Sequence, residues 1–288
     1  MELRVLKYFL VVAREENITR AAALLHLTQP TLSRQLMQLE DELGVKLFRR
    51  SKYRIILTDD GILLRRRAQE IIDLAEKTRQ EFQRQEGELV GDIFIGTGES
   101  NSMTILSQRI AAFRQSHPLV RFHIYSATAD EIQERLEKGL LDLGMLTEPV
   151  DIGRYEFIRL SNRDRWGVWV CRDHPLAQKE AITPSDLLGV PLLLPRREQV
   201  QRELFNWFGD GSERLEIAAT HNLILNAANM IQNGVGIAIG FLIDNLSDDL
   251  QFIPLSPEMK TGTVLVWKKD QASSPAATAF LDILKNPN

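Results

Sequence analysis

One stretch near the start of the chain, HLTQPTLSRQLMQLE at positions 26–40, strongly constrains what this chain can fold into. Its apolar residues recur at intervals of four, three and four, as one helix face packed on a core requires: Leu32, Leu36, Leu39 and Leu43. Pro30 fits the first turn of such a helix, where the hydrogen-bond ladder needs no backbone N–H. Thr28 is placed to cap its start and Gly44 to end it.

Two more helices precede this one. A first apolar stripe consists of Leu3, Leu6, Leu10 and Ala13, with Phe9 beside it. Thr19 is a good N-cap for a second helix, RAAALLHL, in which three consecutive alanines let a neighbouring helix approach closely. Two helices joined by a tight turn, the second polar on its outer face, form a helix-turn-helix.

The polar side chains on that outer face are of the types that read DNA. Arginine pairs with guanine edges, glutamine with adenine edges, and hydroxyls with bases or phosphate. A basic cluster follows in a turn before a short strand at 55–57, as in a wing laid along the phosphate backbone. The residues that we predict to contact DNA are Thr19, Gln29, Pro30, Thr31, Ser33, Arg34, Gln35, Arg49, Arg50, Lys52 and Arg54.

Charge is divided unevenly along the chain. Residues 1–67 hold 13 Lys and Arg against 8 Asp and Glu, a balance of +5, whereas the remainder is at −9. The overall pI near 5.8 therefore hides a basic head on an acidic body. A basic head favours an anionic partner, although uneven surface charge without a functional meaning is the alternative.

The run FLVVAREENITRAAALLHLTQPTLSRQLMQLEDELGVKLFRRSKYRIILTDDG carries an ordered set of landmarks within about sixty residues. They are Ala21-Ala22, Leu25, Gln29-Pro30, Leu32-Ser33, Leu39-Glu40, Leu43-Gly44, Leu47-Phe48, Arg50, Leu57-Thr58 and Gly61. This run resembles the DNA-binding head of LysR-type transcriptional regulators. Asp60 stands where the family usually has alanine, and SKYR replaces the commoner glycine-rich wing tip.

After Thr58, a plausible N-cap, one helical segment extends to about residue 85. Positions at alternating spacings of four and three form a coiled-coil seam: Leu64, Ala68, Ile71, Ala75, Thr78 and Phe82. The resemblance implies dimerisation at this linker helix, in agreement with the symmetric dimers of many helix-turn-helix proteins. The alternative is a helix packed on its own domain. We predict a winged helix-turn-helix domain at 1–58 and a linker and dimerisation helix at 59–89.

From residue 90 strands and helices alternate, and the pattern restarts after LSNRDR. Such alternation implies a parallel sheet with helices on both faces. Two Rossmann-like α/β lobes linked by crossing strands form the periplasmic-binding-protein-like fold (type 2), which the family's effector domain shares. We expect lobe 1 at about 90–160 and 266–288, and lobe 2 at about 161–265. The segments RDHPLA, LLDLGML and IQNGVGIAIG extend the resemblance over essentially the full length.

Ligands in such folds bind at the carboxyl ends of strands, between the lobes. The loop GTGESNSMT places hydroxyls and amides at a helix N-terminus, which suits an anion such as a carboxylate. The loops SATAD and THNL are equivalent, and the resemblance adds Thr147 and the LPRRE segment. The predicted effector residues are Ser100, Asn101, Ser102, Thr104, Thr128, Thr147, Arg197 and Asn222. Each of them can instead be only a helix cap or turn residue.

Other classes of protein find little support. GTGESN lacks the third glycine of a dinucleotide fingerprint, the five histidines show no metal-ligand spacing, and no nucleophile-elbow motif is present. The lone Cys171 excludes an internal disulfide. The apolar runs are too short for a bilayer span, and MELRVLKYFLVVAREEN lacks a signal-peptide cleavage site. We therefore expect a cytoplasmic protein without catalytic residues, bound metal or cofactor.

The sequence thus predicts a DNA-binding transcriptional regulator controlled by a small-molecule effector between the two lobes. Its partners would be double-stranded promoter DNA, further copies of itself in a homodimer or homotetramer, and RNA polymerase if it activates. The alternatives are a solute-binding protein, which would need export and no basic head, and a small-molecule enzyme with an accessory DNA-binding head.

Overall fold

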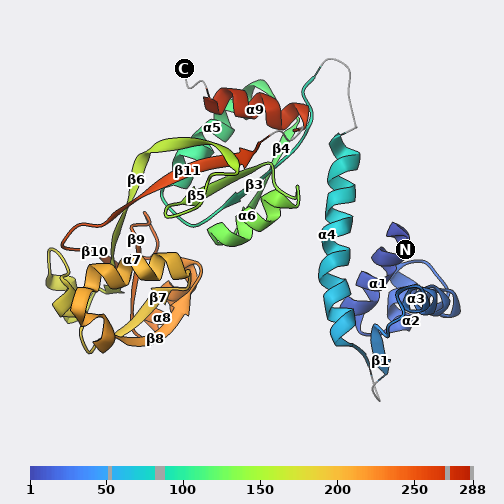
Figure 1. The fold of residues 1–288 in the computed structure, drawn as a ribbon, viewed down its shortest axis with the longest axis horizontal. Helices are drawn as coiled ribbons and strands as arrows, with labels where there is room; N and C mark the ends of the chain where they lie inside the picture. The colour runs from blue at the N-terminus through green and yellow to red at the C-terminus, as the bar shows by residue number, and fades with distance from the viewer. Residues whose placement is uncertain (51–53, 82–87, 270–272, 286–288) are drawn as a thin grey trace. The chain divides into compact units, whose positions relative to one another are not determined.

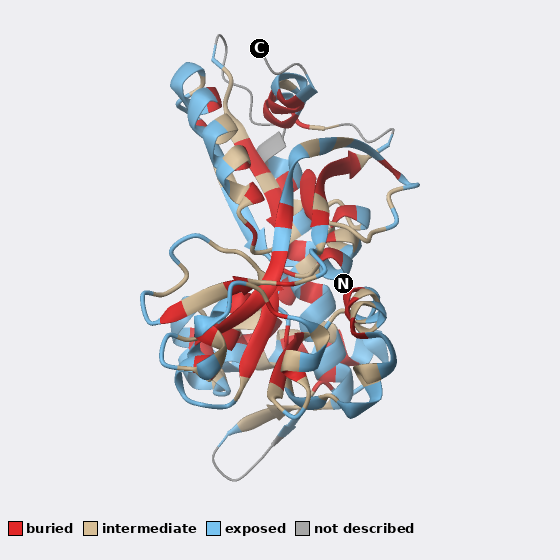
Figure 2. Ribbon diagram, turned by 90° about the vertical axis from the view of Figure 1, so that its left-hand side faces the viewer, coloured by how far each residue is buried: buried red, intermediate tan, exposed pale blue. Residues whose placement is uncertain are grey.

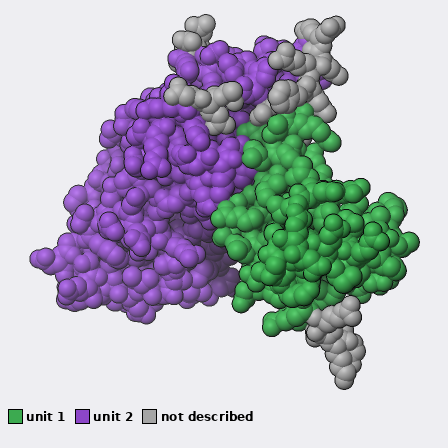
Figure 3. Space-filling model, turned by 45° about the vertical axis from the view of Figure 1, so that its right-hand side comes forward, with its two compact units in different colours: residues 1–83 green, residues 84–288 purple. Residues whose placement is uncertain are grey.

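The computed structural model describes residues 1–50, 54–81, 88–269 and 273–285. They belong to two compact units, Met1–Gln83 and Arg84–Asn288, which we call the head and the body (Figure 3). The helix predicted as a separate linker therefore belongs to the head. Among the described residues, no helix has the length and apolar character needed to cross a membrane.

The head consists of helices and one short hairpin (Figure 1): α1 (Leu3–Glu15), α2 (Ile18–Leu24), α3 (Gln29–Leu43), β1 (Phe48–Arg50), β2 (Ile55–Leu57) and α4 (Asp59–Glu81). The predicted cap of α2 was wrong by two residues. Asn17 is the N-cap, because its backbone is extended and its side-chain oxygen accepts a hydrogen bond from the Arg20 N–H at 3.0 Å. Thr19 lies inside the helix instead.

The predicted limits of α3 are confirmed. Thr28 is the N-cap residue and Pro30 lies in the first turn. The hydroxyl of Thr28 is 2.8 Å from that of Thr31 and does not cap a backbone N–H. Gly44 ends the helix with φ at 70°, a left-handed conformation that glycine adopts without steric cost.

The head has one hydrophobic core to which all four helices contribute. Its fully buried members include Leu6, Phe9, Val12, Ala21, Leu32, Leu39, Leu47 and Ala68. Thr58 caps α4 as predicted, since its hydroxyl accepts from the Gly61 N–H at 3.0 Å and donates to the Lys46 carbonyl at 2.6 Å. This pair of hydrogen bonds ties the start of α4 to the chain just before the wing.

The predicted dimer seam divides between two faces of α4. Ala68 is fully buried in the head's own core, and Leu64 packs against that core. The prediction was therefore wrong for Ala68, because a side chain already enclosed by its own domain cannot face a partner. Ile71 and Thr78 are exposed and Ala75 is half-buried. Phe82 lies outside the described residues.

The body has two lobes joined by two long strands (Figure 1). Lobe 1 contains β3 (Gly91–Thr97), α5 (Ser102–Ser116), β4 (Val120–Ser126), α6 (Ala129–Glu137), β5 (Leu143–Thr147) and α9 (Pro275–Lys285). Lobe 2 contains 3-10 helices η1 (Pro175–Gln178), η2 (Pro184–Leu187) and η3 (Gly209–Arg214), helices α7 (Glu198–Phe208) and α8 (Ile224–Gln232), and strands β7 (Pro191–Pro195), β8 (Glu216–His221), β9 (Ile237–Phe241) and β10 (Leu250–Pro254). The joining strands are β6 (Tyr155–Cys171) and β11 (Lys260–Lys268).

The strands of the body form one mixed sheet over the described residues, in the order β4-β3-β5-β11-β6-β9-β7-β8, with β10 paired to β6. Pairing is parallel within each lobe, as predicted, but β6 and β11 are antiparallel to their neighbours. The strand WGVWVC, predicted to begin anew after LSNRDR, is instead the second half of one continuous strand, β6. The lobe boundary predicted at about 265 falls within β11, whose Thr263 pairs with Thr147 of lobe 1.

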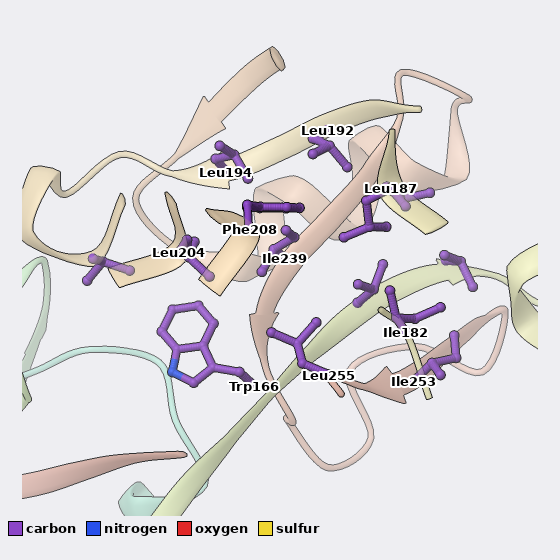
Figure 4. Close-up of a cluster of buried hydrophobic side chains, with 14 of the residues drawn as sticks. Trp166, Ile182, Leu187, Leu192, Leu194, Leu204, Phe208, Ile239, Ile253 and Leu255 are labelled. Carbon is purple, nitrogen blue, oxygen red and sulfur yellow. The ribbon is translucent and has the colours of Figure 1, made fainter. Parts of the chain in front are cut away.

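Each lobe has its own hydrophobic core. In lobe 1, the ring of Phe280 packs edge to face on Phe113 and Phe122. In lobe 2, aliphatic residues from several elements surround the sheet and reach Trp166 on β6 (Figure 4). Buried residues follow the strands through the body, and exposed residues gather on the outer helix faces (Figure 2). The crossing strands thus hold two separately packed lobes side by side.

Candidate functional site

The outer face of α3 carries the polar side chains predicted to read DNA. Gln29, Pro30, Thr31 and Arg34 are exposed on α3, and Thr19 is exposed on α2. Ser33 and Gln35 are half-buried, because they lie on the flanks of the helix beside the buried leucines. The Arg34 guanidinium has no hydrogen bond or ion pair within the described residues, so it is available to a partner. Sequence reasoning missed Met37, whose side chain is also exposed on this helix.

The wing follows α3 as an antiparallel hairpin in which Arg49 pairs with Ile56. Arg49 is exposed, and exposed Arg54 forms an ion pair with Glu16 at 3.1 Å. Arg50 ends β1, although the environment of its side chain is not described, and Lys52 lies outside the described residues. The hairpin therefore continues directly from the α3 helix with arginines on its surface.

A buried carboxylate connects α3 to the wing. Glu40 accepts hydrogen bonds from the backbone N–H groups of Leu47 at 2.8 Å and Phe48 at 3.3 Å, and from the Lys46 ammonium at 2.8 Å. Burial raises the pKa of Glu40, but these donors outweigh it and hold the pKa below its usual value. Glu40 thus stays ionised and fixes the direction in which the wing leaves α3.

In the body, a pocket lies between the lobes and encloses about 770 Å³, its open mouth included. Lobe 1 contributes the loops that follow β3 and β4 and the last residues of β5. Lobe 2 contributes the ends of β7, β8 and β9 with the residues that follow them, so the pocket lies at the carboxyl ends of the parallel strands. Most of the lining is apolar: Ala127, Ala129, Met145, Leu146, Trp166, Pro195, Val200, Leu223, Ile224, Phe241 and Ile243.

Polar contacts between described residues join the two lobes around this pocket. Arg197 of lobe 2 donates from Nε to Asp130 of lobe 1 at 3.1 Å. The carboxylate of Glu99 in lobe 1 accepts from the Leu225 N–H at 3.3 Å, in the first turn of α8. A carboxylate is favoured there by the helix dipole. Asn101 accepts from the Asp244 N–H at 3.0 Å.

The structure brings together four of the predicted effector residues and separates the others from them. Thr128, Thr147, Arg197 and Asn222 line the pocket. Among the described residues, the lining does not include Ser100, Asn101, Ser102 or Thr104. Thr104 is exposed on α5, and the Asn101 side chain is used in the inter-lobe contact. The loop that we predicted as an anion cradle therefore contributes Gly98 and Glu99 instead.

Ser102 has a structural role. Its side chain is fully buried, and its hydroxyl donates to the Asp164 carboxylate at 3.0 Å and lies 3.1 Å from the Thr263 hydroxyl. Thr263 donates to the same Asp164 oxygen at 3.0 Å. An anion at Ser102 would meet this buried carboxylate, so the prediction that Ser102 holds an anionic effector was wrong.

His221 is the pocket residue that sequence reasoning overlooked most clearly. It lies between Thr220 and Asn222 in the THNL segment, and those two residues attracted attention as polar turn residues. Side chains alternate along a strand, so His221 points inward where its neighbours point outward. His221 is one of the residues that line the pocket. Only the last residue of β8 is buried, and the sequence does not show which residues of this strand face the interior.

Two family models together match almost the whole chain. The model described as bacterial regulatory helix-turn-helix protein, lysR family, matches residues 3–62. The model described as LysR substrate binding domain matches residues 86–287. The first match covers α1 to the start of α4, and the second covers the body that holds the pocket.

Relatives and solved structures agree with these matches. The HTH-type transcriptional regulator BsdA of Bacillus subtilis is 34% identical over 98% of this chain and 100% of its own. The Hca operon transcriptional activator HcaR of Escherichia coli is 28% identical over 99% of this chain and 97% of its own. The crystal structure of CbnR, a LysR family transcriptional regulator, superposes with a TM-score of 0.78 at 24% identity, over 99% of this chain and 98% of that one. Full-length CbnR complexed with its target DNA gives 0.76 at 24%, over 99% of both chains. The chain therefore belongs to the LysR family of bacterial transcriptional regulators.

Proposed function

We propose that the inter-lobe pocket of the body binds a small organic effector that controls how the heads engage DNA. The observation that carries this proposal is that both lobes line one mostly apolar pocket and touch through only a few polar contacts around it. A ligand seated there contacts both lobes at once. It therefore changes the free-energy difference between arrangements of the lobes, which is the requirement for an effector.

The effector would be a compact, mostly apolar molecule with a carboxylate or other anionic group. Arg196 supports this proposal, because it lines the pocket and its guanidinium has no ion pair or hydrogen bond within the described residues. Arg197 is less suitable, since its guanidinium already pairs with Asp130 and the Thr147 carbonyl. Glu99 opposes an anion at the α8 side of the pocket, so the anionic group belongs at the Arg196 side.

The head would bind double-stranded promoter DNA as part of a homodimer, and two dimers would form a homotetramer. The support is an apolar strip on α4 that the head's own core leaves exposed: Leu63, Ile71 and Leu74. The protein would act by binding and without turnover, in the cytoplasm. If it activates transcription, effector binding would change the spacing of the heads, the bend of the DNA and the recruitment of RNA polymerase.

Melting of the full-length protein with a panel of small aromatic and aliphatic carboxylates tests the pocket. At least one compound should raise the melting temperature and change the affinity for promoter DNA. Arg196→Ala should weaken that compound about tenfold, the usual loss for a charged hydrogen bond of about 1.4 kcal/mol. Arg202→Ala is the matched control, because Arg202 is exposed on α7 and pairs only with Glu198. Equal losses in both variants would contradict the role of Arg196.

A further inference from the structure

The polar side chains of the pocket differ in whether the protein already provides them with a partner. Thr128 is in a capping box with Glu131, Arg197 pairs with Asp130, and Glu99 accepts from the first turn of α8. These side chains are held in place by the fold. Asn222 is exposed and can hydrogen-bond to water. His221 belongs to neither group.

His221 ends β8, and its backbone carbonyl accepts from the Arg196 N–H at 2.7 Å. The residue is 9% exposed, and neither Nδ1 nor Nε2 has a hydrogen-bond partner of normal geometry within the described residues. Burial lowers the pKa of His221, and the nearby backbone of Ile239 only partly opposes this. The ring is therefore neutral at pH 7. Its one N–H has the Ile239 backbone as a neighbour, whereas the lone pair on its other nitrogen has no partner within the described residues.

A buried polar atom without a partner destabilises the folded protein, which is why nearly all such atoms in native structures are hydrogen-bonded. Leucine or valine would fill the same space without this cost. A histidine with only a packing role would therefore destabilise the protein at this position. A histidine that hydrogen-bonds to a ligand, in contrast, is expected to lack a partner in the ligand-free protein. Its position in the pocket wall agrees with the second explanation.

We propose that His221 is a specificity-determining residue that hydrogen-bonds to a hydroxyl group of the effector inside the pocket. This inference rests on the proposed function of the pocket as an effector site. A hydroxyl can donate to the lone pair of the neutral imidazole, which a carboxylate cannot do because it has no proton to donate. An ammonium could donate to it, but burying a charge beside an uncharged ring costs far more than burying a hydroxyl. The neutral ring therefore favours a hydroxyl over a second ionised group.

The remaining lining defines the rest of the ligand. Trp166 and Phe241 line the same pocket and lie against each other, with ring centroids 4.4 Å apart, so an apolar or aromatic skeleton is favoured beside them. Arg196 is exposed and follows β7 directly beside His221, so it places the anionic group at an exposed part of the pocket near His221. The inferred class is a mostly apolar carboxylic acid with a hydroxyl on its buried end.

The melting temperature of the ligand-free, full-length protein tests whether the ring is unpartnered. His221→Leu should raise it by about 2 °C, because a polar atom without a partner is removed from the interior. Thr220→Val is the matched control on the exposed side of the same strand and should leave the melting temperature unchanged. A clear decrease in His221→Leu would mean that the fold itself satisfies the ring, and would overturn the inference.

Calorimetry with benzoate and its three monohydroxy derivatives tests the hydroxyl. Wild type should bind one hydroxy isomer about tenfold more tightly than benzoate, as one satisfied buried hydrogen bond predicts. His221→Leu should lose this preference yet keep its affinity for benzoate, and His221→Gln, which retains a donor and an acceptor, should recover part of it. An unchanged preference in His221→Leu would overturn the inference alone. Failure of all carboxylates to bind wild type would overturn the proposed function and this inference together.

Discussion

Arg197 in lobe 2 and Asp130 in lobe 1 form an ion pair across the pocket, with 3.1 Å between Nε and Oδ1. The two partners differ in environment, because the Arg197 side chain is 8% exposed and that of Asp130 is 62% exposed. Arg197 also donates to the Thr147 carbonyl at 3.4 Å. The contact is thus anchored by a buried arginine, and water screens its carboxylate partner.

Arg197→Met should lower the stability of the body by about 1–3 kcal/mol, because a buried hydrogen-bonding group is lost between the lobes. Urea denaturation of the full-length protein measures this change. Arg202→Met is the matched control, since its ion pair with Glu198 is exposed on both sides and should contribute little. Similar decreases in the free energy of unfolding for both variants would show that the inter-lobe contact stabilises the body no more than an exposed ion pair does.

Glu40→Gln should destabilise the head by about 1–3 kcal/mol and weaken binding to all DNA sequences, because the wing loses its anchor. The pKa of Glu40 is lowered in the folded head, so its contribution is present above the unfolded pKa of about 4.3. That contribution disappears as the pH falls through the lower, folded pKa. Wild type and variant should therefore converge in stability at acid pH, and a constant difference would contradict this account.

Gly61→Ala should disrupt the head. A Cβ at this position would lie 2.1 Å from the Leu47 carbonyl oxygen and 2.9 Å from a Leu57 methyl group. The backbone would have to shift between α4 and the wing, which costs about 1–3 kcal/mol or more. Asp60→Ala is the control, because Asp60 is exposed in the same turn. Circular dichroism melting that finds both variants equally stable would contradict the close packing.

Two arginines of the head should differ in their effect on DNA binding. Arg34→Ala should cost about 1–3 kcal/mol on the specific operator and relax specificity, as loss of a base contact does. Arg49→Ala should weaken specific and random DNA alike and reduce the salt dependence by about one unit, as loss of a phosphate contact does. Fluorescence anisotropy over a salt series measures both. Identical behaviour of the two variants would assign them to the same kind of contact.

The stability of the body should also depend on pH through His221. The pKa of His221 in the folded body lies below the unfolded value of about 6.5. Between these two pKa values, the unfolded chain binds a proton that the folded body does not bind. Stability should therefore fall as the pH drops below about 6.5. The dependence of the unfolding free energy on pH should be weaker in His221→Leu, by an amount that corresponds to at most one bound proton. Denaturation at a series of pH values measures this dependence. An unchanged slope would mean that the ring titrates normally in the folded protein.

Much of the head could be predicted because its signals are local. The limits of α3 follow from the apolar spacing, Pro30 and Gly44, all within one helix. Ala68 shows where such signals end. The same spacing of four and three suits a partner helix or the domain's own core, and only the packed head shows that Ala68 is enclosed by its own core.

The body shows the same division at the level of the pocket. Alternating strands and helices, the two lobes and the loops at the strand ends were determined by the sequence, because hydrophobic periodicity is carried by each segment alone. Which side chains enter the pocket was decided by tertiary structure. Ser102 carried the expected hydroxyl, but long-range contacts with Asp164 and Thr263 enclose it. His221 became a pocket residue only through the phase of β8 and the approach of the opposite lobe, and neither is encoded within the THNL segment itself.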